Sequence, residues 1–165
     1  MAPKFANISE YMSSHLYLWR MQNHAIIPLS SRNYPELITI WEASVRATHH
    51  FLNEADIQHY KPLILNQYFD QVILYGLKDL DNIAGFIGIN GKLIQMLFIH
   101  PDYRGKGMGK SLIDYAIGMH QVDSVDVNEE NLQAVGFYQH LGFVVEERYE
   151  EDAAGKPYPI LSMRK

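Results

Sequence analysis

The feature that most restricts the fold is a strand of apolar residues that leads into a glycine-rich turn and then into a helix. Residues 93–99 are almost entirely apolar, which is typical of a central strand covered on both faces. Gly105, Gly107 and Gly109 alternate after it, and an amphipathic helix is predicted over residues 107–120. Glycine lets a backbone approach a ligand closely, and a helix N-terminus presents unpaired N–H groups. The segment therefore predicts an anion-binding turn.

The charges of this segment agree with that prediction. The chain carries 19 acidic and 14 basic residues, for a net charge of −5, and no basic face of the kind that binds nucleic acid is visible. Neither nucleic acid nor a membrane is expected as a partner. Against this acidic background Arg104, Lys106 and Lys110 form a short basic window among the glycines. The window indicates a phosphate or diphosphate ligand, although a solvated turn would have the same composition.

Two common phosphate-binding loops do not match the segment. The P-loop requires G-x-x-x-x-G-K-[ST], and Arg104 stands where its first glycine should be, although Gly109-Lys110-Ser111 matches its end. The dinucleotide fingerprint requires G-x-G-x-x-G in a first βαβ unit, whereas the glycines here are spaced G-x-G-x-G and lie late in the chain. An unrelated nucleotide-binding domain is therefore a weak alternative.

The remaining periodicities predict a mixed α/β domain with an antiparallel meander first and crossover helices later. Asn53 is expected to cap the second helix, and Pro62 to kink or break it. Asn90-Gly91 indicates a two-residue hairpin between two strands. Strands are expected over residues 24–29, 72–78, 83–90, 93–99, 124–127, 143–150 and 158–164, and helices over 36–48, 54–68, 107–120 and 131–141.

Composition limits the rest of the chain. Residues 1–20 show no clean period and are expected to be a poorly ordered or tag-like extension before a single domain over residues 21–165. No apolar run approaches the ~20 residues of a membrane span, and the first twenty residues do not resemble a secretion signal, so a cytoplasmic location is expected. The absence of cysteine excludes disulfides, thiolate metal sites and an enzyme thioester. No metal site is expected, because the histidines lack H-E-x-x-H spacing.

Two segments resemble the GNAT superfamily of acetyl-CoA-dependent N-acetyltransferases. Arg104, Gly107 and Gly109 form R-x-x-G-x-G, which is similar to the diphosphate-binding motif [QR]-x-x-G-x-[GA] of that family. Downstream, a second set of residues follows the family pattern, namely Asn131, Ala134, Phe137-Tyr138 and Gly142-Phe143. The resemblance covers about residues 22–164 and is nearest to small stand-alone bacterial members. It implies a GNAT fold, with a central, mostly antiparallel twisted sheet of six to seven strands and about four flanking helices.

The resemblance also implies which residues bind acetyl-CoA. Backbone amides of the strand before the turn would face the pantetheine arm and the acetyl carbonyl. Asn131, Ala134 and Tyr138 are spaced to share one helix face. The implied cofactor-binding residues are Leu97, Phe98, Ile99, Arg104, Gly105, Lys106, Gly107, Met108, Gly109, Lys110, Asn131, Ala134 and Tyr138.

By the same resemblance Tyr138 is the general acid that protonates the departing CoA thiolate. A phenol with a pKa near ~10 is protonated at neutral pH and suits this role. A tyrosine packed in the core is the alternative. With no cysteine in the chain, acetyl transfer is expected to be direct, within a ternary complex.

The base that takes the proton of the amine is left open. His49, at the end of the first helix, is a candidate because histidine titrates near neutral pH. Packing at the helix end is the alternative, and water could carry the proton. The acceptor is expected to be a small-molecule or protein amine, held near Trp41, Phe51, Tyr60 and Tyr158. A homodimer is compatible with the sequence, and a non-catalytic sensor of CoA or acyl-CoA is the alternative function.

Overall fold

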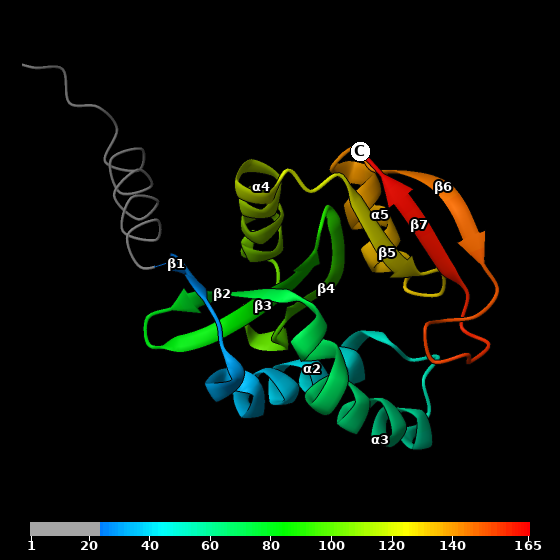
Figure 1. The fold of residues 1–165 in the computed structure, drawn as a ribbon, viewed down its shortest axis with the longest axis horizontal. Helices are drawn as coiled ribbons and strands as arrows, with labels where there is room; N and C mark the ends of the chain where they lie inside the picture. The colour runs from blue at the N-terminus through cyan, green and yellow to red at the C-terminus, as the bar shows by residue number, and fades with distance from the viewer. Residues whose placement is uncertain (1–23) are drawn as a thin grey trace, which may run out of the picture.

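The computed structural model describes residues 24–165 (Figure 1). The expected extension, residues 1–20, and the domain boundary at residue 21 lie outside the described residues. Seven strands form one sheet in the order β1-β2-β3-β4-β5-β7-β6. Their bounds are β1 (His24–Pro28), β2 (Ile73–Asp79), β3 (Asn82–Asn90), β4 (Leu93–Ile99), β5 (Ser124–Asn128), β6 (Val144–Tyr149) and β7 (Ile160–Arg164).

Four α-helices cover the two faces of the sheet within residues 24–165 (Figure 1). Helices α2 (Tyr34–Thr48) and α3 (Glu54–Leu63) pack on one face, around a core that includes Leu37 and Trp41. Helices α4 (Met108–His120) and α5 (Leu132–His140) pack on the other, around a core that includes Leu112 and Tyr138. This arrangement confirms the predicted mixed α/β fold, with its mostly antiparallel sheet and about four helices.

Local signals place most of the helix ends. The Asn53 side chain accepts a hydrogen bond from the Asp56 backbone N–H at 2.9 Å, which confirms it as the cap of α3. Helix α3 ends at Leu63, one residue after Pro62, and the chain continues as a wider π-helical turn, Ile64–Tyr68. Pro62 lacks the N–H that the regular helix would use. Gly142, at φ +92°, follows the end of α5 as the expected stop.

Two sequence-based details differ from the structure. The hairpin between β3 and β4 turns on Gly91-Lys92, one residue later than predicted, because Asn90 still pairs with Leu93 and Gly91 carries the positive φ. In α4, the spacing of Leu112, Tyr115, Ala116 and Met119 by three and four residues predicts one apolar face, but Met119 is 67% exposed. The buried face of α4 includes Ile113 instead, so the stripe is rotated around the helix.

The sheet opens between its two central strands. Strands β4 and β5 are the parallel pair among the described strands, and they pair only at Leu93 with Ser124 and at Ile94 with Val125. Ile94 and Met96 oppose the adjacent residues 89 and 88 of β3, so Gln95 between them is the extra residue of a bulge. A bulge bends its strand and increases the local twist. Beyond residue 94, β4 therefore separates from β5 and leaves a gap in the middle of the sheet.

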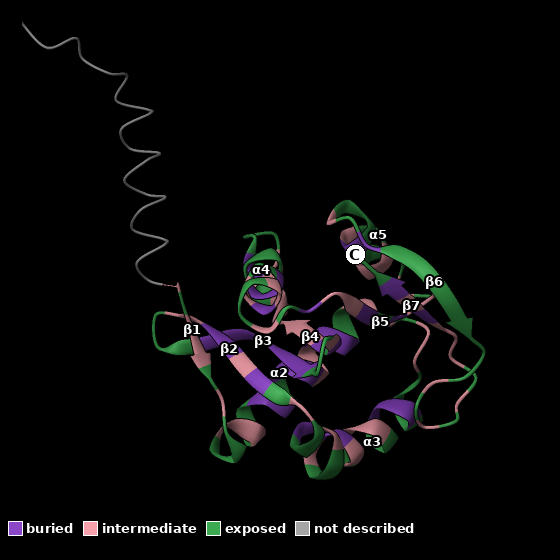
Figure 2. Ribbon diagram, turned by 45° about the horizontal axis from the view of Figure 1, so that its top comes forward, coloured by how far each residue is buried: buried purple, intermediate pink, exposed green. Residues whose placement is uncertain are grey.

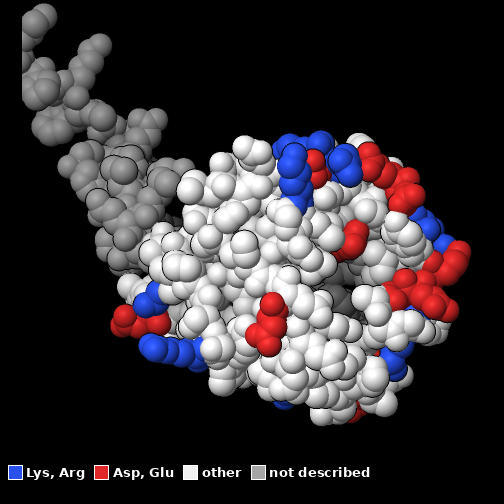
Figure 3. Space-filling view, in the orientation of Figure 1, with Lys and Arg blue, Asp and Glu red and all other residues white. Residues whose placement is uncertain are grey.

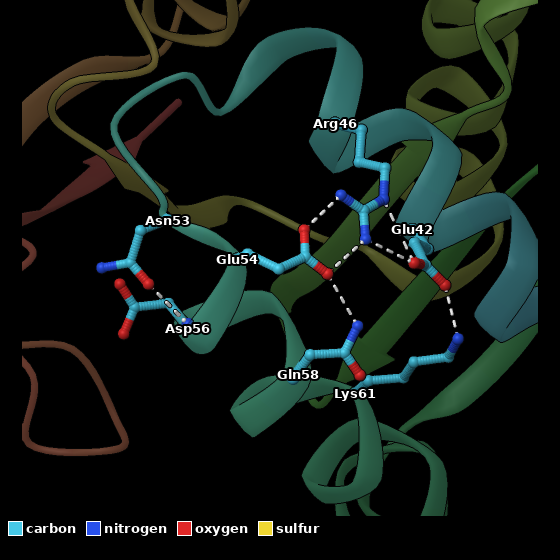
Figure 4. Close-up of polar contacts among 7 residues, drawn as sticks. All are labelled: Glu42, Arg46, Asn53, Glu54, Asp56, Gln58 and Lys61. Carbon is cyan, nitrogen blue, oxygen red and sulfur yellow. Dashed lines mark hydrogen bonds and ion pairs between the residues drawn. The ribbon is translucent and has the colours of Figure 1, made fainter.

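Helix α3 is tied both to α2 and to the loop between β6 and β7. Figure 4 shows Arg46 of α2 bonded to Glu54 of α3 at 2.7 Å, beside Glu42 and Lys61. Arg46 and Glu54 are exposed and Glu42 and Lys61 are partly exposed, so these ion pairs orient the two helices and stabilise them little. On its other side, Asp56 accepts hydrogen bonds from the side chains of Lys156 and Tyr158, and Tyr60 donates to Asp152. The β6–β7 loop is thereby held against α3, although β6 itself is an exposed edge strand (Figure 2).

Candidate active site

A cleft of about 470 Å³ opens where β4 and β5 separate. Its volume lies in the range of ligand-binding sites in proteins. It is lined by β4, the glycine turn, the first turn of α4, helix α5 and the end of α2. Figure 3 shows this side of the molecule hollowed between α3 and strands β5 and β7, with acidic side chains near the rim.

Nearly all of the predicted site residues line this cleft. They come from four separate elements, so the gap in the sheet brings them together. The lining residues among them are His49, Leu97, Phe98, Ile99, Arg104, Gly105, Gly107, Met108, Gly109, Lys110, Asn131, Ala134 and Tyr138. Lys106 is not among the lining residues. Its Nζ donates to the Asp102 carbonyl at 3.1 Å and lies 5.0 Å from the centre of the Tyr103 ring.

The glycine turn has the shape of an anion cradle. Gly105 and Gly107 adopt left-handed conformations, with φ +72° and +77°, and a Cβ at either would meet nothing within 4 Å. Gly107 caps α4, and its carbonyl accepts the Ser111 N–H at 3.0 Å. The N–H groups of the first helical turn before Ser111 have no partner within the helix. They open onto a lined cleft, so the turn fits a diphosphate.

Arg104 connects the turn to α2. Its guanidinium donates to the Ser44 hydroxyl at 2.8 Å and to the Ser44 carbonyl at 3.3 Å, and Ser44 is buried. Burial lowers the pKa of Arg104 below its ordinary value, although arginine stays protonated. The side chain still lines the cleft, so it brings positive charge to the site while it anchors the turn.

Tyr138 is both a core residue and a cleft residue. Its side chain is only 5% exposed and packs edge-to-face on Phe143, with ring centres 5.7 Å apart. Among the described residues the Tyr138 hydroxyl has no hydrogen-bond partner. Every fully buried side-chain oxygen or nitrogen in residues 24–165 does have one, so the Tyr138 oxygen is not fully buried. The hydroxyl is therefore accessible from the cleft. Burial raises the pKa of Tyr138, which keeps the phenol protonated.

Asn131 and Ala134 begin the helix that carries Tyr138. The Asn131 Oδ1 accepts the Ala134 backbone N–H at 3.2 Å and so caps α5. The amide nitrogen of the same side chain can still donate a hydrogen bond. Asn131, Ala134 and Tyr138 all line the cleft, as their helical spacing predicts.

His49 is neutral in this setting. The Thr48 hydroxyl donates to the Ser44 carbonyl at 2.8 Å, so at its other contact, 2.9 Å from His49 Nδ1, it must accept. The proton of the neutral imidazole is thus on Nδ1. Burial, with Arg104 and His50 nearby, lowers the pKa of His49 to about 4.

The aromatic residues predicted around the acceptor divide into two groups. Trp41 is 4% exposed and belongs to the core under α2. Phe51 packs on Tyr158 with ring centres 5.8 Å apart, and on His49 at 5.2 Å, so these side chains continue from the cleft toward α3. Tyr60 lies further along, in its contact with Asp152.

Ser44, Gln95 and Asp126 are three of the cleft residues that sequence reasoning missed. Ser44 lies on the apolar face of α2, and a buried serine there was the available signal for the bond to Arg104. Gln95 interrupts an otherwise apolar strand, and the structure places it in the bulge. Asp126 stands between two valines of β5, and its carboxylate lines the cleft.

Two kinds of feature are absent from residues 24–165. No three His, Asp or Glu side chains there are grouped as metal ligands would be. No helix in that range is long and apolar enough to cross a membrane.

Comparisons with known proteins agree with the fold and the motifs. A family model described as "Acetyltransferase (GNAT) domain" matches residues 42–160. Peptidyl-lysine N-acetyltransferase YjaB of Salmonella typhimurium is 41% identical over 128 residues, which cover 78% of this chain and 88% of the relative. YjaB of Escherichia coli K12 is 39% identical over 128 residues, which cover 78% of this chain and 87% of the relative.

Solved structures agree as well. The solution structure of apo YjaB from Escherichia coli has a TM-score of 0.76 at 36% identity, over 86% of this chain and 96% of that one. A PaiA N-acetyltransferase from Thermoplasma acidophilum, in complex with coenzyme A, has a TM-score of 0.70 at 20% identity, over 86% and 99% of the two chains. The second likeness concerns the fold alone. The chain therefore belongs to the GNAT family of acetyl-CoA-dependent N-acetyltransferases.

Proposed function

We propose that this protein transfers the acetyl group of acetyl-CoA directly to the side-chain amine of a lysine in a peptide or protein. Acetyl transfer to an amine follows from membership of the family. Lysine as the acceptor is supported by the two YjaB relatives, which are named peptidyl-lysine N-acetyltransferases. The observation that carries the proposal is the single cleft shared by the glycine turn and the Tyr138 hydroxyl.

The chain offers two kinds of backbone donor to the cosubstrate. The N–H groups at the start of α4, beyond Gly105 and Gly107, would hold the diphosphate, and Arg104 and Lys110 would add positive charge. Strand β4 leaves β5 after Ile94. Its backbone groups over residues 97–99 can therefore pair with the extended pantetheine arm as a further strand would. Asn131 and Ala134 would contact the same arm from α5.

Acetyl-CoA, when bound, supplies the acetyl group as an activated thioester. Tyr138 would then hold a proton at its phenol oxygen and give it to the departing thiolate. A thiolate is a weaker base than the buried Tyr138 phenolate, so proton transfer from the phenol to the thiolate is unfavourable in energy. The sulfur must therefore lie within hydrogen-bonding distance of the hydroxyl for the transfer to occur. The ring is fixed by Phe143 and Phe137, which limits where the proton can be delivered.

The test is an acetylation assay with purified protein, acetyl-CoA and a short peptide that has blocked ends and one lysine. We expect release of free thiol together with one acetyl group on the peptide, found by mass spectrometry. Small amines form a parallel panel. A sensor of CoA would instead be stabilised against heat by CoA, with no thiol released for any amine, and that result would contradict the proposal.

Gly107→Ala should weaken CoA binding by about tenfold or more, since a left-handed alanine costs about 1–2 kcal/mol and moves the turn. The φ of +77° at Gly107 is the cause. Gly91→Ala is the matched control, because Gly91 has φ +60° but lies in the β3–β4 hairpin, outside the cleft. Calorimetric titration with CoA measures both variants. Equal affinities for CoA in the two variants would contradict a role of Gly107 in binding.

Two further sequence-based expectations stay predictions. A cytoplasmic location agrees with acetyl-CoA as cosubstrate, and fractionation of cells would test it. A homodimer would use an exposed edge such as β6, whose residues are all exposed.

A further inference from the structure

One acidic side chain lines the cleft and has no role in the function proposed above. Of the lining residues in the described part of the chain, Asp126 alone is an aspartate or glutamate. It lies in the middle of β5, between the buried residues Val125 and Val127. Successive side chains of a strand point to opposite faces, so Asp126 faces away from the two valines. The ion pairs formed among residues 24–165 do not include it.

The side of the sheet that Asp126 faces is the side of α2 and α3. Val125 and Val127 share a core cluster with Tyr138 and Met108, under α4 and α5. Asp126 therefore reaches the cleft from the opposite side to Tyr138. His49, at the end of α2, also lines the cleft. Asp126 is therefore placed to contact an acceptor that enters the cleft from the side of α2 and α3.

Within residues 24–165, the two positive side chains of the cleft, Arg104 and Lys110, make their contacts with residues other than Asp126. Arg104 bonds to Ser44, and Lys110 bonds to Asp114 at 2.5 Å. On the neighbouring strand β7, Ser162 is the register partner of Asp126, and Arg164, two residues away on the same face, pairs with Asp123 and Glu146 instead. On β6, one strand further, Tyr149 lies near Asp126 and donates to Glu147. A cationic amine is the partner that this carboxylate lacks.

The walls of the cleft also make Asp126 a better proton acceptor than an ordinary aspartate. Although the side chain stays accessible to solvent, the surrounding protein raises the pKa of its carboxyl, and a hydrogen bond from Ser162 offsets part of the rise. His49, with a pKa of about 4, is a weak base for its residue type. Efficient proton transfer is favoured when the pKa of the base approaches the working pH.

We propose that Asp126 is a catalytic residue that binds the acceptor ammonium and takes its proton. This inference rests on the proposed function. One proton passes from the ammonium nitrogen to the Asp126 carboxylate, and the freed nitrogen forms the new C–N bond as the C–S bond breaks. The thiolate takes the Tyr138 proton, the second amine proton restores the phenol through water, and Asp126 releases its proton to solvent. The net products are the acetylated amine, CoA and one proton.

Asp126→Asn tests the assignment, because asparagine keeps the size of the side chain and removes its charge. We expect kcat/KM for the lysine peptide to fall by about 100-fold or more, with CoA affinity unchanged within about twofold. The wild-type profile of kcat/KM against pH should lose activity on the acid side as Asp126 is protonated. That acid limb should be missing from the variant. Glu147→Gln is the matched control, since Glu147 lies on β6, two strands from Asp126, and does not line the cleft.

A second measurement does not need turnover. Binding of the same peptide to the enzyme–CoA complex, followed by calorimetry, should weaken by about tenfold or more in Asp126→Asn and stay unchanged in Glu147→Gln. If Asp126→Asn binds the peptide as tightly as the wild type, or keeps kcat/KM within about threefold, the assignment is wrong. A wild-type protein that releases no thiol would contradict the proposed function, and the binding comparison would still decide whether Asp126 binds the amine.

Discussion

Tyr138→Phe should lower kcat for acetyl transfer by about 100-fold or more, because it removes the proton donor and leaves everything around it in place. The ring is held by Phe143 and Phe137, and the hydroxyl has no partner among residues 24–165. Loss of the hydroxyl therefore leaves no buried group unsatisfied, and stability should change by less than about 1 kcal/mol. Steady-state kinetics with the lysine peptide, and thermal unfolding, measure the two effects separately.

The matched control for this prediction is Tyr149→Phe. Tyr149 is 49% exposed, lies on the edge strand β6 and does not line the cleft. It should keep wild-type kcat. CoA affinity should be the same in both variants, since the diphosphate site lies in the glycine turn. If Tyr138→Phe turns over at nearly the wild-type rate, Tyr138 is a packing residue and the thiolate takes its proton from water.

Acidification should destabilise this protein through His49. Burial lowers the pKa of His49 to about 4 in the folded state, whereas the unfolded chain has the ordinary value near ~6.5. Between these two values the unfolded state binds a proton that the folded state does not. The contribution of His49 to the free energy of unfolding is therefore fully present above about pH 6.5 and is lost as the pH drops toward about 4. The loss from this one residue should reach up to about 3 kcal/mol at the acid end.

His49→Asn isolates this contribution, because asparagine can keep the hydrogen bond to Thr48 without titrating. Urea unfolding near pH 7 and near pH 4.5 gives the acid loss of stability for each protein. The loss should be smaller in His49→Asn than in the wild type, while His59→Asn, at an exposed position of α3, should match the wild type. Equal acid losses in all three proteins would show that His49 is accessible to protons in the folded state.

The sequence predicted more of the fold than of the candidate site. The strands, the helices and the mixed sheet followed from periodicity, and the register of the β3–β4 hairpin missed by a single residue. Among the site residues, Lys106 fitted the local pattern but lies along the turn, outside the cleft. Asp126 fitted no local pattern, because one carboxylate between two valines is equally typical of an exposed strand face.

The sequence by itself determined the elements whose causes act over a few residues. Gly105 and Gly107 permit positive φ, Asn53 and Asn131 cap the helix that follows each of them, and Pro62 ends a helix because it has no N–H. Only the tertiary structure decided the contents of the cleft. Arg104 turns to Ser44, 60 residues earlier, and β4 leaves β5 after two paired positions. Such contacts depend on how separate elements pack, and no spacing along the chain encodes the gap through which Asp126 and Tyr138 reach the same cleft.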